Sequence, residues 1–199
     1  MAVMRAMIDD LTTIGDTSNS IVLPVVEDTT EPTTNINVPG LWLVKPTDID
    51  RLTRLLTHMH RVDEVWDDEA NLNRGLWFMS HYTAPTSMLF DVENGGGFVA
   101  FIRTTAGWRT QVYAAAWTRR AFGRDDLFRT ACKLMMLTHD LRVIDSFVKL
   151  DNRISQRATL RAGFKNRGVI KNAQCYNGAL RPMFWNEIDR AALGLREDE

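Results

Sequence analysis

The chain has 199 residues, of which 45% are apolar, and a formal net charge of −1 at pH 7. A chain of this length and composition can bury the core of one globular domain, and its near-zero charge supplies no overall basic field for nucleic acid or an anionic membrane. No stretch approaches the roughly 20 apolar residues of a membrane span, and the N-terminus lacks a signal-peptide pattern. We therefore expect a one-domain protein with no nucleic-acid partner, no membrane association and no secretion signal.

The first 40 residues differ in composition from the rest. A short apolar stripe at helical spacing precedes residues 12–40, which are rich in Thr, Ser, Asn and Asp and are interrupted by prolines. A lone helix of about ten residues is marginal in water unless it packs on a partner. Two interpretations stay open: a disordered tail, or a hook and extended arm (residues 1–40) that fasten the chain to other protein subunits in an oligomeric assembly. The hook would bind its partner through Val3, Met4, Met7, Ile8 and Leu11.

Residues 41–190 alternate between strand and helix patterns, and residues 191–199 resemble a short polar tail. Apolar runs between turn residues predict strands, and apolar residues at every third or fourth position predict helices. Thr47 and Asp50 resemble a capping box at the start of the first helix. The pattern predicts an α/β fold of the α+β type, with a mixed, mostly antiparallel sheet flanked by helices. The predicted elements are, in order, a strand at 42–44, helices at 49–62 and 67–79, strands at 88–92, 97–103 and 110–117, a helix at 125–140, a strand at 143–150, a helix from 152, and strands at 168–176 and 183–188.

The cysteines and histidines do not form a recognisable pattern. Cys132 and Cys175 are isolated from each other, which favours buried thiols in a reducing compartment over a disulfide. The four histidines are scattered along the chain, and neither residue type has the ligand spacing of a zinc site. We therefore expect no metal.

The stretch 151–164, DNRISQRATLRAGF, follows one predicted strand and precedes another. Asn152 is a favourable helix N-cap, and Gly163 suits the position after a helix because it reaches positive φ without a Cβ clash. The stretch also resembles the last catalytic segment of the GNAT superfamily of N-acetyltransferases. That segment has Asn, a small residue three positions later, Tyr four after that, and Gly-Phe four after that. The corresponding residues here are Asn152, Ser155, Thr159, Gly163 and Phe164, so the spacing matches and the tyrosine does not.

A second GNAT motif places the pyrophosphate of CoA on backbone amides at a helix N-terminus. It consists of Gln or Arg, two free positions, Gly, one free position, and Gly or Ala. Arg120 and Gly123 match its first half, but Asp125 replaces the last small residue and Asp126 follows. Either these acids satisfy the amides and dipole of their own helix, or neighbouring arginines offset them and the anion site works. If CoA binds, the resemblance implies that Arg120, Gly123 and Arg124 hold the pyrophosphate and that Asn152 orders the pantetheine end.

Acyl transfer to an amine also needs a base, and an acid near the sulfur of CoA. Thr159 is a far weaker acid than the phenol that the family places there. Tyr113 and Tyr176 could act from elsewhere, although no pattern places them in the site. The strand at 110–117 carries no carboxylate.

The departures from both GNAT motifs favour a protein that keeps the fold but does not bind CoA or transfer an acyl group. In this respect the sequence resembles the acetyltransferase-like structural and internal virion proteins of tailed bacteriophages. The resemblance implies a virion-associated assembly component with a degenerate CoA site and no cofactor, found in the virion and the host cytoplasm. The alternative is an active N-acyltransferase that uses acetyl-CoA and an amine acceptor that the sequence does not name.

Overall fold

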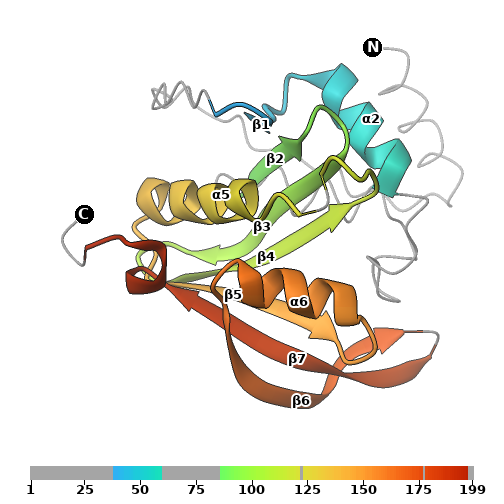
Figure 1. The fold of residues 1–199 in the computed structure, drawn as a ribbon, viewed down its shortest axis with the longest axis vertical. Helices are drawn as coiled ribbons and strands as arrows, with labels where there is room; N and C mark the ends of the chain where they lie inside the picture. Colours follow the sequence, from blue (N-terminus) through green and yellow to red (C-terminus); the bar gives the residue numbers. More distant parts are fainter. Residues whose placement is uncertain (1–37, 60–85, 122, 177, 197–199) are drawn as a thin grey trace, which may run out of the picture. The chain divides into compact units, whose positions relative to one another are not determined.

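The computed structural model describes residues 38–59, 86–121, 123–176 and 178–196. The predicted order of strands and helices in these ranges is confirmed (Figure 1). The helix predicted at 67–79 and the hook residues of the N-terminal arm lie outside the described residues. The elements are β1 (Leu41–Leu43), α2 (Ile49–Met59), β2 (Met88–Val92), β3 (Gly97–Thr105), β4 (Arg109–Ala116), α5 (Asp125–Thr138), β5 (Val143–Lys149), α6 (Arg153–Arg161), β6 (Lys165–Tyr176), β7 (Ala179–Asp189) and the 3-10 helix η2 (Ala191–Leu193).

The strands form one seven-stranded sheet in the order β1-β2-β3-β4-β5-β7-β6. Neighbouring strands are antiparallel except β4 and β5, which are parallel. This parallel pairing joins residues 109–112 to residues 143–146 only. Beyond it, β4 stays paired with β3 as far as Ala116, and β5 stays paired with β7 as far as Lys149. The sheet is therefore split between the C-terminal halves of β4 and β5.

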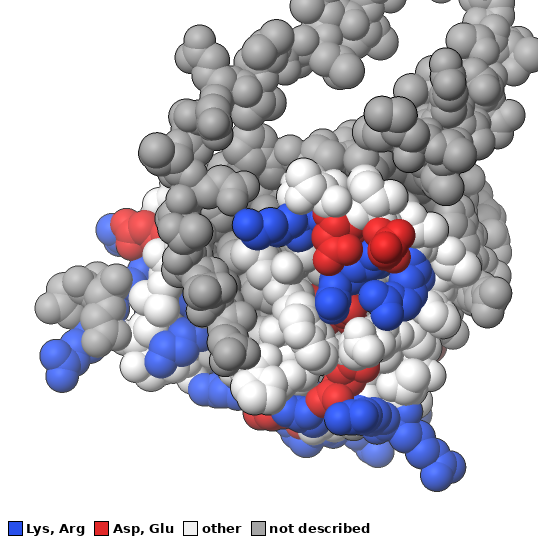
Figure 2. All heavy atoms as spheres, turned by 90° about the horizontal axis from the view of Figure 1, so that it is seen from above, with Lys and Arg blue, Asp and Glu red and all other residues white. Residues whose placement is uncertain are grey.

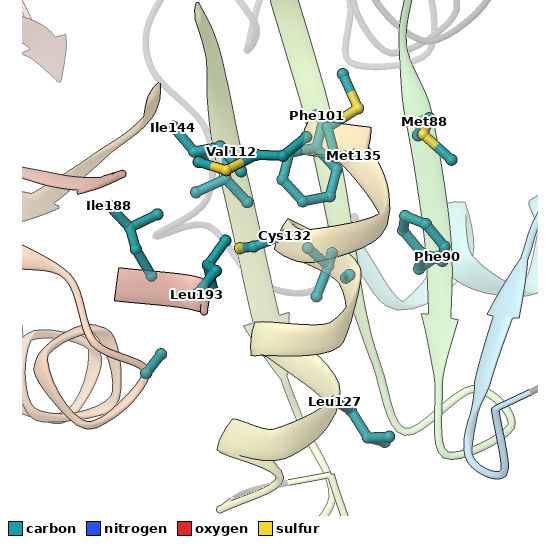
Figure 3. Packing of buried hydrophobic residues seen from close by; sticks show 14 of the residues in the cluster. Met88, Phe90, Phe101, Val112, Leu127, Cys132, Met135, Ile144, Ile188 and Leu193 are labelled. Carbon is teal, nitrogen blue, oxygen red and sulfur yellow. The ribbon is translucent and has the colours of Figure 1, made fainter. Parts of the chain in front are cut away.

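Helices cover both faces of the sheet. On one face, α5 packs its buried side chains against β2, β3, β4 and β5, and Figure 3 shows Met135 and Cys132 of α5 in the same cluster as Phe101, Val112 and Ile144. On the other face, α2 contributes a smaller cluster in which its leucines pack against the first strands. Ala162 and Phe164, which directly follow α6 (Arg153–Arg161), also belong to the larger cluster, so α5 and the end of α6 lie on the same face.

Some predicted details of the helices are wrong. The helical spacing of the apolar residues predicts Thr138 on the buried face of α5, but Thr138 is exposed, whereas Cys132 and Met136 are fully buried. The capping box at Thr47 is displaced by one residue, because Oδ1 of Asp48 accepts the hydrogen bond from the Arg51 amide at 3.2 Å. Periodicity identifies an apolar stripe, but the sheet decides which edge of that stripe is covered.

The segment after β7 is not wholly the polar tail that its composition suggests. Leu193 and Leu195 are each only 6% exposed and join the larger core cluster. Arg129 of α5 holds the segment by donating from Nη2 to the Ala192 carbonyl at 2.8 Å. The buried Arg190 donates to the carbonyl of Leu141 at 3.1 Å. These long-range contacts fold part of residues 191–199 back onto the domain.

The two cysteines lie in different environments. Cys132 is completely buried, as expected, and burial raises the pKa of its thiol because the thiolate would be desolvated. Cys175 lies on the edge strand β6 and is exposed, so the prediction of a buried thiol is wrong at this position. The two are not joined in a disulfide.

A core substitution on α5 tests the packing. Met135 is fully buried, so Met135→Ala should lower the free energy of unfolding by about 2–5 kcal/mol through lost contacts and a residual cavity. Leu137 is 41% exposed on the same helix, and Leu137→Ala should change it by about 0.5 kcal/mol. Urea unfolding of both variants measures the difference, and equal losses would contradict the assigned face of α5.

The cysteine environments predict selective labelling. A thiol-specific reagent at neutral pH should modify Cys175 rapidly and Cys132 only after unfolding, because the reactive species is the thiolate. Mass spectrometry of labelled peptides, with and without urea, identifies the modified residue. Labelling of both cysteines at similar rates in the native protein would show that α5 does not bury Cys132.

Candidate functional site

The split between β4 and β5 contains a cavity of about 320 Å³. Its walls include residues 113–116 of β4, residues 146–149 of β5, the loop before α5, and the first turns of α6. The mutually facing edges of β4 and β5 are not paired with each other here, so their peptide groups can bond an extended ligand as a further strand would. The cavity is therefore suited to a long, narrow molecule with amide groups.

The N-terminus of α5 points at this cavity. Gly123, Arg124 and Asp125 line the cavity wall, and Arg124 is the N-cap residue, whose side chain makes no capping hydrogen bond. Gly123 has φ +83°, and a Cβ added there would meet no atom within 4 Å. The first-turn amides and the helix dipole of this 14-residue helix favour an anion at that end.

The two acids of this turn are both neutralised by arginines. Asp125 accepts from Nε of Arg161, on α6, at 2.6 Å. Asp126 accepts from Nε and Nη2 of Arg124, both at 2.9 Å, and these hydrogen bonds are the main cause of the lowered pKa of the Asp126 carboxyl. Asp125 therefore bridges to α6, and its carboxylate is compensated at the cavity wall. Both acids are thus paired with arginines, as an offset anion site requires, and anion binding itself stays a prediction.

A third acid near the loop, Glu93, was not identified as a site residue from the sequence. Glu93 lies in the turn between β2 and β3, and its side chain is only 4% exposed. It accepts from Nε of Arg120 at 2.7 Å and also from Nη1 of Arg124. The sequence signal is an acid followed by Asn94 and three glycines, a pattern that by itself predicts only a turn.

The glycine turn between β2 and β3 is hydrogen-bonded to the loop that precedes α5. The indole Nε1 of Trp117 donates to the Gly95 carbonyl at 2.6 Å, and the Trp117 amide donates to the Gly96 carbonyl at 3.0 Å. A Cβ at Gly96 would lie 2.5 Å from Oγ1 of Thr118, and a Cβ at Gly97 would lie 2.6 Å from the Ala115 carbonyl oxygen. The turn and the loop before α5 therefore pack together as one unit that larger residues would separate.

The ends of α6 have the predicted local geometry. Oδ1 of Asn152 accepts from the Ser155 amide at 3.0 Å, as an N-cap does. At the other end, the Gly163 amide bonds the Leu160 carbonyl, the Phe164 amide bonds the Thr159 carbonyl, and Gly163 has φ +99°. This is a Schellman motif. Helix capping accounts for both Asn152 and Gly163. Asn152 also lines the cavity, and a contact between its side chain and a ligand stays a prediction.

Thr159 and Tyr113 both carry hydroxyl groups and line the cavity. Thr159, at the position of the family's tyrosine, is 5% exposed and donates to the Ser155 carbonyl at 2.8 Å. Tyr113 lines the cavity at the first β4 position beyond the pairing with β5, and its oxygen accepts from Nε2 of Gln111 at 2.9 Å. The structure thus brings Tyr113 to the split, which the sequence could not do; the side chain of Tyr176 lies outside the described part.

The remaining predicted residue, Arg120, does not line the cavity. Its side chain is 84% exposed and bonds Glu93, next to the cavity-lining Ala121. Acidic and basic side chains lie beside one another on the face shown in Figure 2. Among the described residues, no group of three or more His, Cys, Asp or Glu side chains could hold a metal ion, and no described helix is long and apolar enough to span a membrane.

Comparison with solved structures identifies similar folds. The ribosomal-protein-S5-alanine acetyltransferase from Vibrio fischeri superposes with a TM-score of 0.59 at 15% identity, over 75% of this chain and 91% of that one. A microcin C7 self-immunity acetyltransferase in complex with acetyl-CoA and AMP gives 0.59 at 15% identity, over 76% and 93%. The spermidine N-acetyltransferase from Vibrio cholerae in complex with CoA and spermine gives 0.57 at 15% identity, over 78% and 99%.

The sequence itself matches no protein-family model and no curated protein. At these low identities the structural likeness concerns the fold. The mixed seven-stranded sheet, split between β4 and β5 and flanked by helices, is the fold of the GNAT acetyltransferases.

Proposed function

We propose that the protein is an N-acyltransferase that uses an acyl-CoA donor and an amine acceptor. The observation that carries this proposal is the cavity in the split sheet, which reaches the N-terminus of α5. In a protein that keeps the fold only for packing, we would expect side chains to fill this cleft. The complexes of similar folds with CoA or acetyl-CoA support the same conclusion.

The residues present fit an acyl-CoA. The space at Gly123 and the amides of the first turn of α5 would take the pyrophosphate, and Arg124 would supply positive charge. The edges of β4 and β5 that no longer pair with each other would bond the amide groups of the pantetheine arm. Bound in this way, the acyl-CoA supplies a thioester as the acyl donor.

The chain's own contribution to the chemistry would be to position the donor and to move a proton. When an amine attacks the thioester carbonyl, a carbon–nitrogen bond forms and the carbon–sulfur bond breaks. The acceptor nitrogen then releases a proton to water, and the leaving thiolate takes up a proton. Tyr113 lies at the split and carries a phenol, whereas the hydroxyl of Thr159 is buried and bonded to the helix backbone. We therefore assign the proton donor to Tyr113. The acceptor is an amine whose further structure no described residue specifies.

A function in a virion assembly stays a prediction. It depended on the hook residues Val3, Met4, Met7, Ile8 and Leu11, which lie outside the described residues, and on a degenerate CoA site. The compensated acids and the cavity support an intact CoA site, whereas Thr159 stays a departure from the family's tyrosine. No observation in the described part favours the assembly function over catalysis.

The first test is isothermal titration of the protein with acetyl-CoA and CoA. We expect micromolar binding that Gly123→Glu abolishes, because the new carboxylate would meet the pyrophosphate at the helix N-terminus. Gly107→Glu is the matched control, since Gly107 has φ +70° and equally free space, but lies in the β3–β4 turn outside the cavity lining. Absence of binding at millimolar ligand by the folded wild type would overturn the proposed function.

The second test concerns the proton donor, with an acceptor found by screening amines for release of the CoA thiol. Tyr113→Phe should lower kcat by about 10²–10⁴-fold and leave CoA affinity unchanged, because only the phenolic proton is lost. Thr159→Val, which removes the other hydroxyl at nearly constant volume, should leave kcat unchanged. The opposite ranking of the two variants would transfer the assignment to Thr159.

A further inference from the structure

We propose that Glu93 is a positioning residue of the anion-binding loop, which holds the guanidinium groups of Arg120 and Arg124 in the orientation that receives the pyrophosphate of CoA. This inference rests on the proposed function and adds to it a residue outside both sequence motifs. Glu93 carries a negative charge close to the proposed pyrophosphate site, and repulsion between like charges would by itself weaken the binding of CoA.

Glu93 is a buried carboxylate that binds two arginines of the loop. Both of its carboxylate oxygens are used, with Oε2 bound by Nε of Arg120 at 2.7 Å and Oε1 bound by Nη1 of Arg124. Its side chain is 4% exposed and does not line the cavity, whereas Arg124 does. The acid therefore binds both arginines without itself lining the cavity that would receive the ligand.

The burial of Glu93 makes these ion pairs difficult to break. A carboxylate this deeply buried is strongly destabilised when its partners leave, because water does not replace them. The arginines should therefore remain on Glu93 when a phosphate arrives, and the phosphate should be bound by their remaining N–H groups. Arg120 binds Glu93 through its Nε, and its side chain is 84% exposed. Its two terminal nitrogens therefore stay accessible while the ion pair fixes the guanidinium group.

Without Glu93, Arg120 would be a long, exposed side chain with no fixed orientation. Ordering such a side chain on ligand binding costs conformational entropy that the ion pair has already offset in the free protein. Orientation and charge thus predict opposite effects. Loss of the negative charge alone should strengthen anion binding, whereas loss of the fixed geometry should weaken it.

The chain offers a matched pair of variants that separates these effects. Glu93→Gln and Asp126→Asn each remove one negative charge from a carboxylate that binds Arg124. Asp126 is 63% exposed and does not contact Arg120, so its loss changes the charge but leaves the buried anchor in place. Glu93 has φ +53°, and glutamine at this position introduces no new branching or backbone strain relative to glutamate.

The experiment is titration of the full chain with CoA at fixed ionic strength. We expect Glu93→Gln to weaken binding by about tenfold or more, the usual size of a lost charged hydrogen bond, and Asp126→Asn to leave it equal or tighter. The loss caused by Glu93→Gln should shrink when Arg120 is already glutamine, because Glu93 acts through that residue. A merely structural effect on the fold would not depend on Arg120 in this way.

The outcomes separate this inference from the one it rests on. Failure of the wild type to bind CoA overturns the proposed function. Binding by the wild type with equal or tighter binding by Glu93→Gln overturns the positioning inference alone. If Glu93→Gln does not fold, Arg120→Lys replaces it, since Arg120 is exposed and lysine keeps the charge but has no Nε. Undiminished CoA affinity in Arg120→Lys would also overturn the inference.

Discussion

The pairing of β4 with β5 ends after four residues on each strand, and the site depends on this limit. Each strand has a second neighbour with which it stays paired, β3 for β4 and β7 for β5. Because strands twist, two halves of a sheet that follow different neighbours separate where their shared hydrogen bonds stop. The core under β4 is anchored by α5, while β5 carries α6 and the β6–β7 hairpin. The resulting split presents peptide edges to a ligand and places Tyr113 at its base.

The charges around the loop before α5 are compensated in three dimensions. Asp125, Asp126 and Glu93 would each oppose a phosphate if they were unpaired, and the first two led the sequence argument toward a degenerate site. In the folded chain, Asp125 bonds Arg161 of the neighbouring helix and Asp126 bonds Arg124. Glu93 bonds two arginines from a turn some 30 residues earlier in the chain. Each of the three acids is therefore paired with at least one arginine in the folded chain.

On α6, Thr159 replaces the tyrosine of the GNAT motif, and a phenol is present instead on β4, at Tyr113. Thr159 keeps the place in the helix, but its hydroxyl bonds the carbonyl of Ser155, as threonines within helices often do. Tyr113 offers a phenol from β4, oriented by Gln111 two residues before it on the same face of the strand. A substitution that seems to remove an acid from one element is therefore compatible with catalysis when another element faces the same cavity.

Much of the fold was determined by the sequence alone, because its signals are local. The alternation of strands and helices, the Asn152 cap and the positive φ of Gly163 depend on neighbouring residues, and they were predicted correctly. The candidate site was only partly predictable. Glu93 and Tyr113, the pairing of Asp125 with Arg161, and the burial of Leu193 and Leu195 depend on residues that are distant in the chain. Only the tertiary structure decided these, since ion pairs, cavities and burial arise from which surfaces meet after folding, and local periodicity carries no information about that choice.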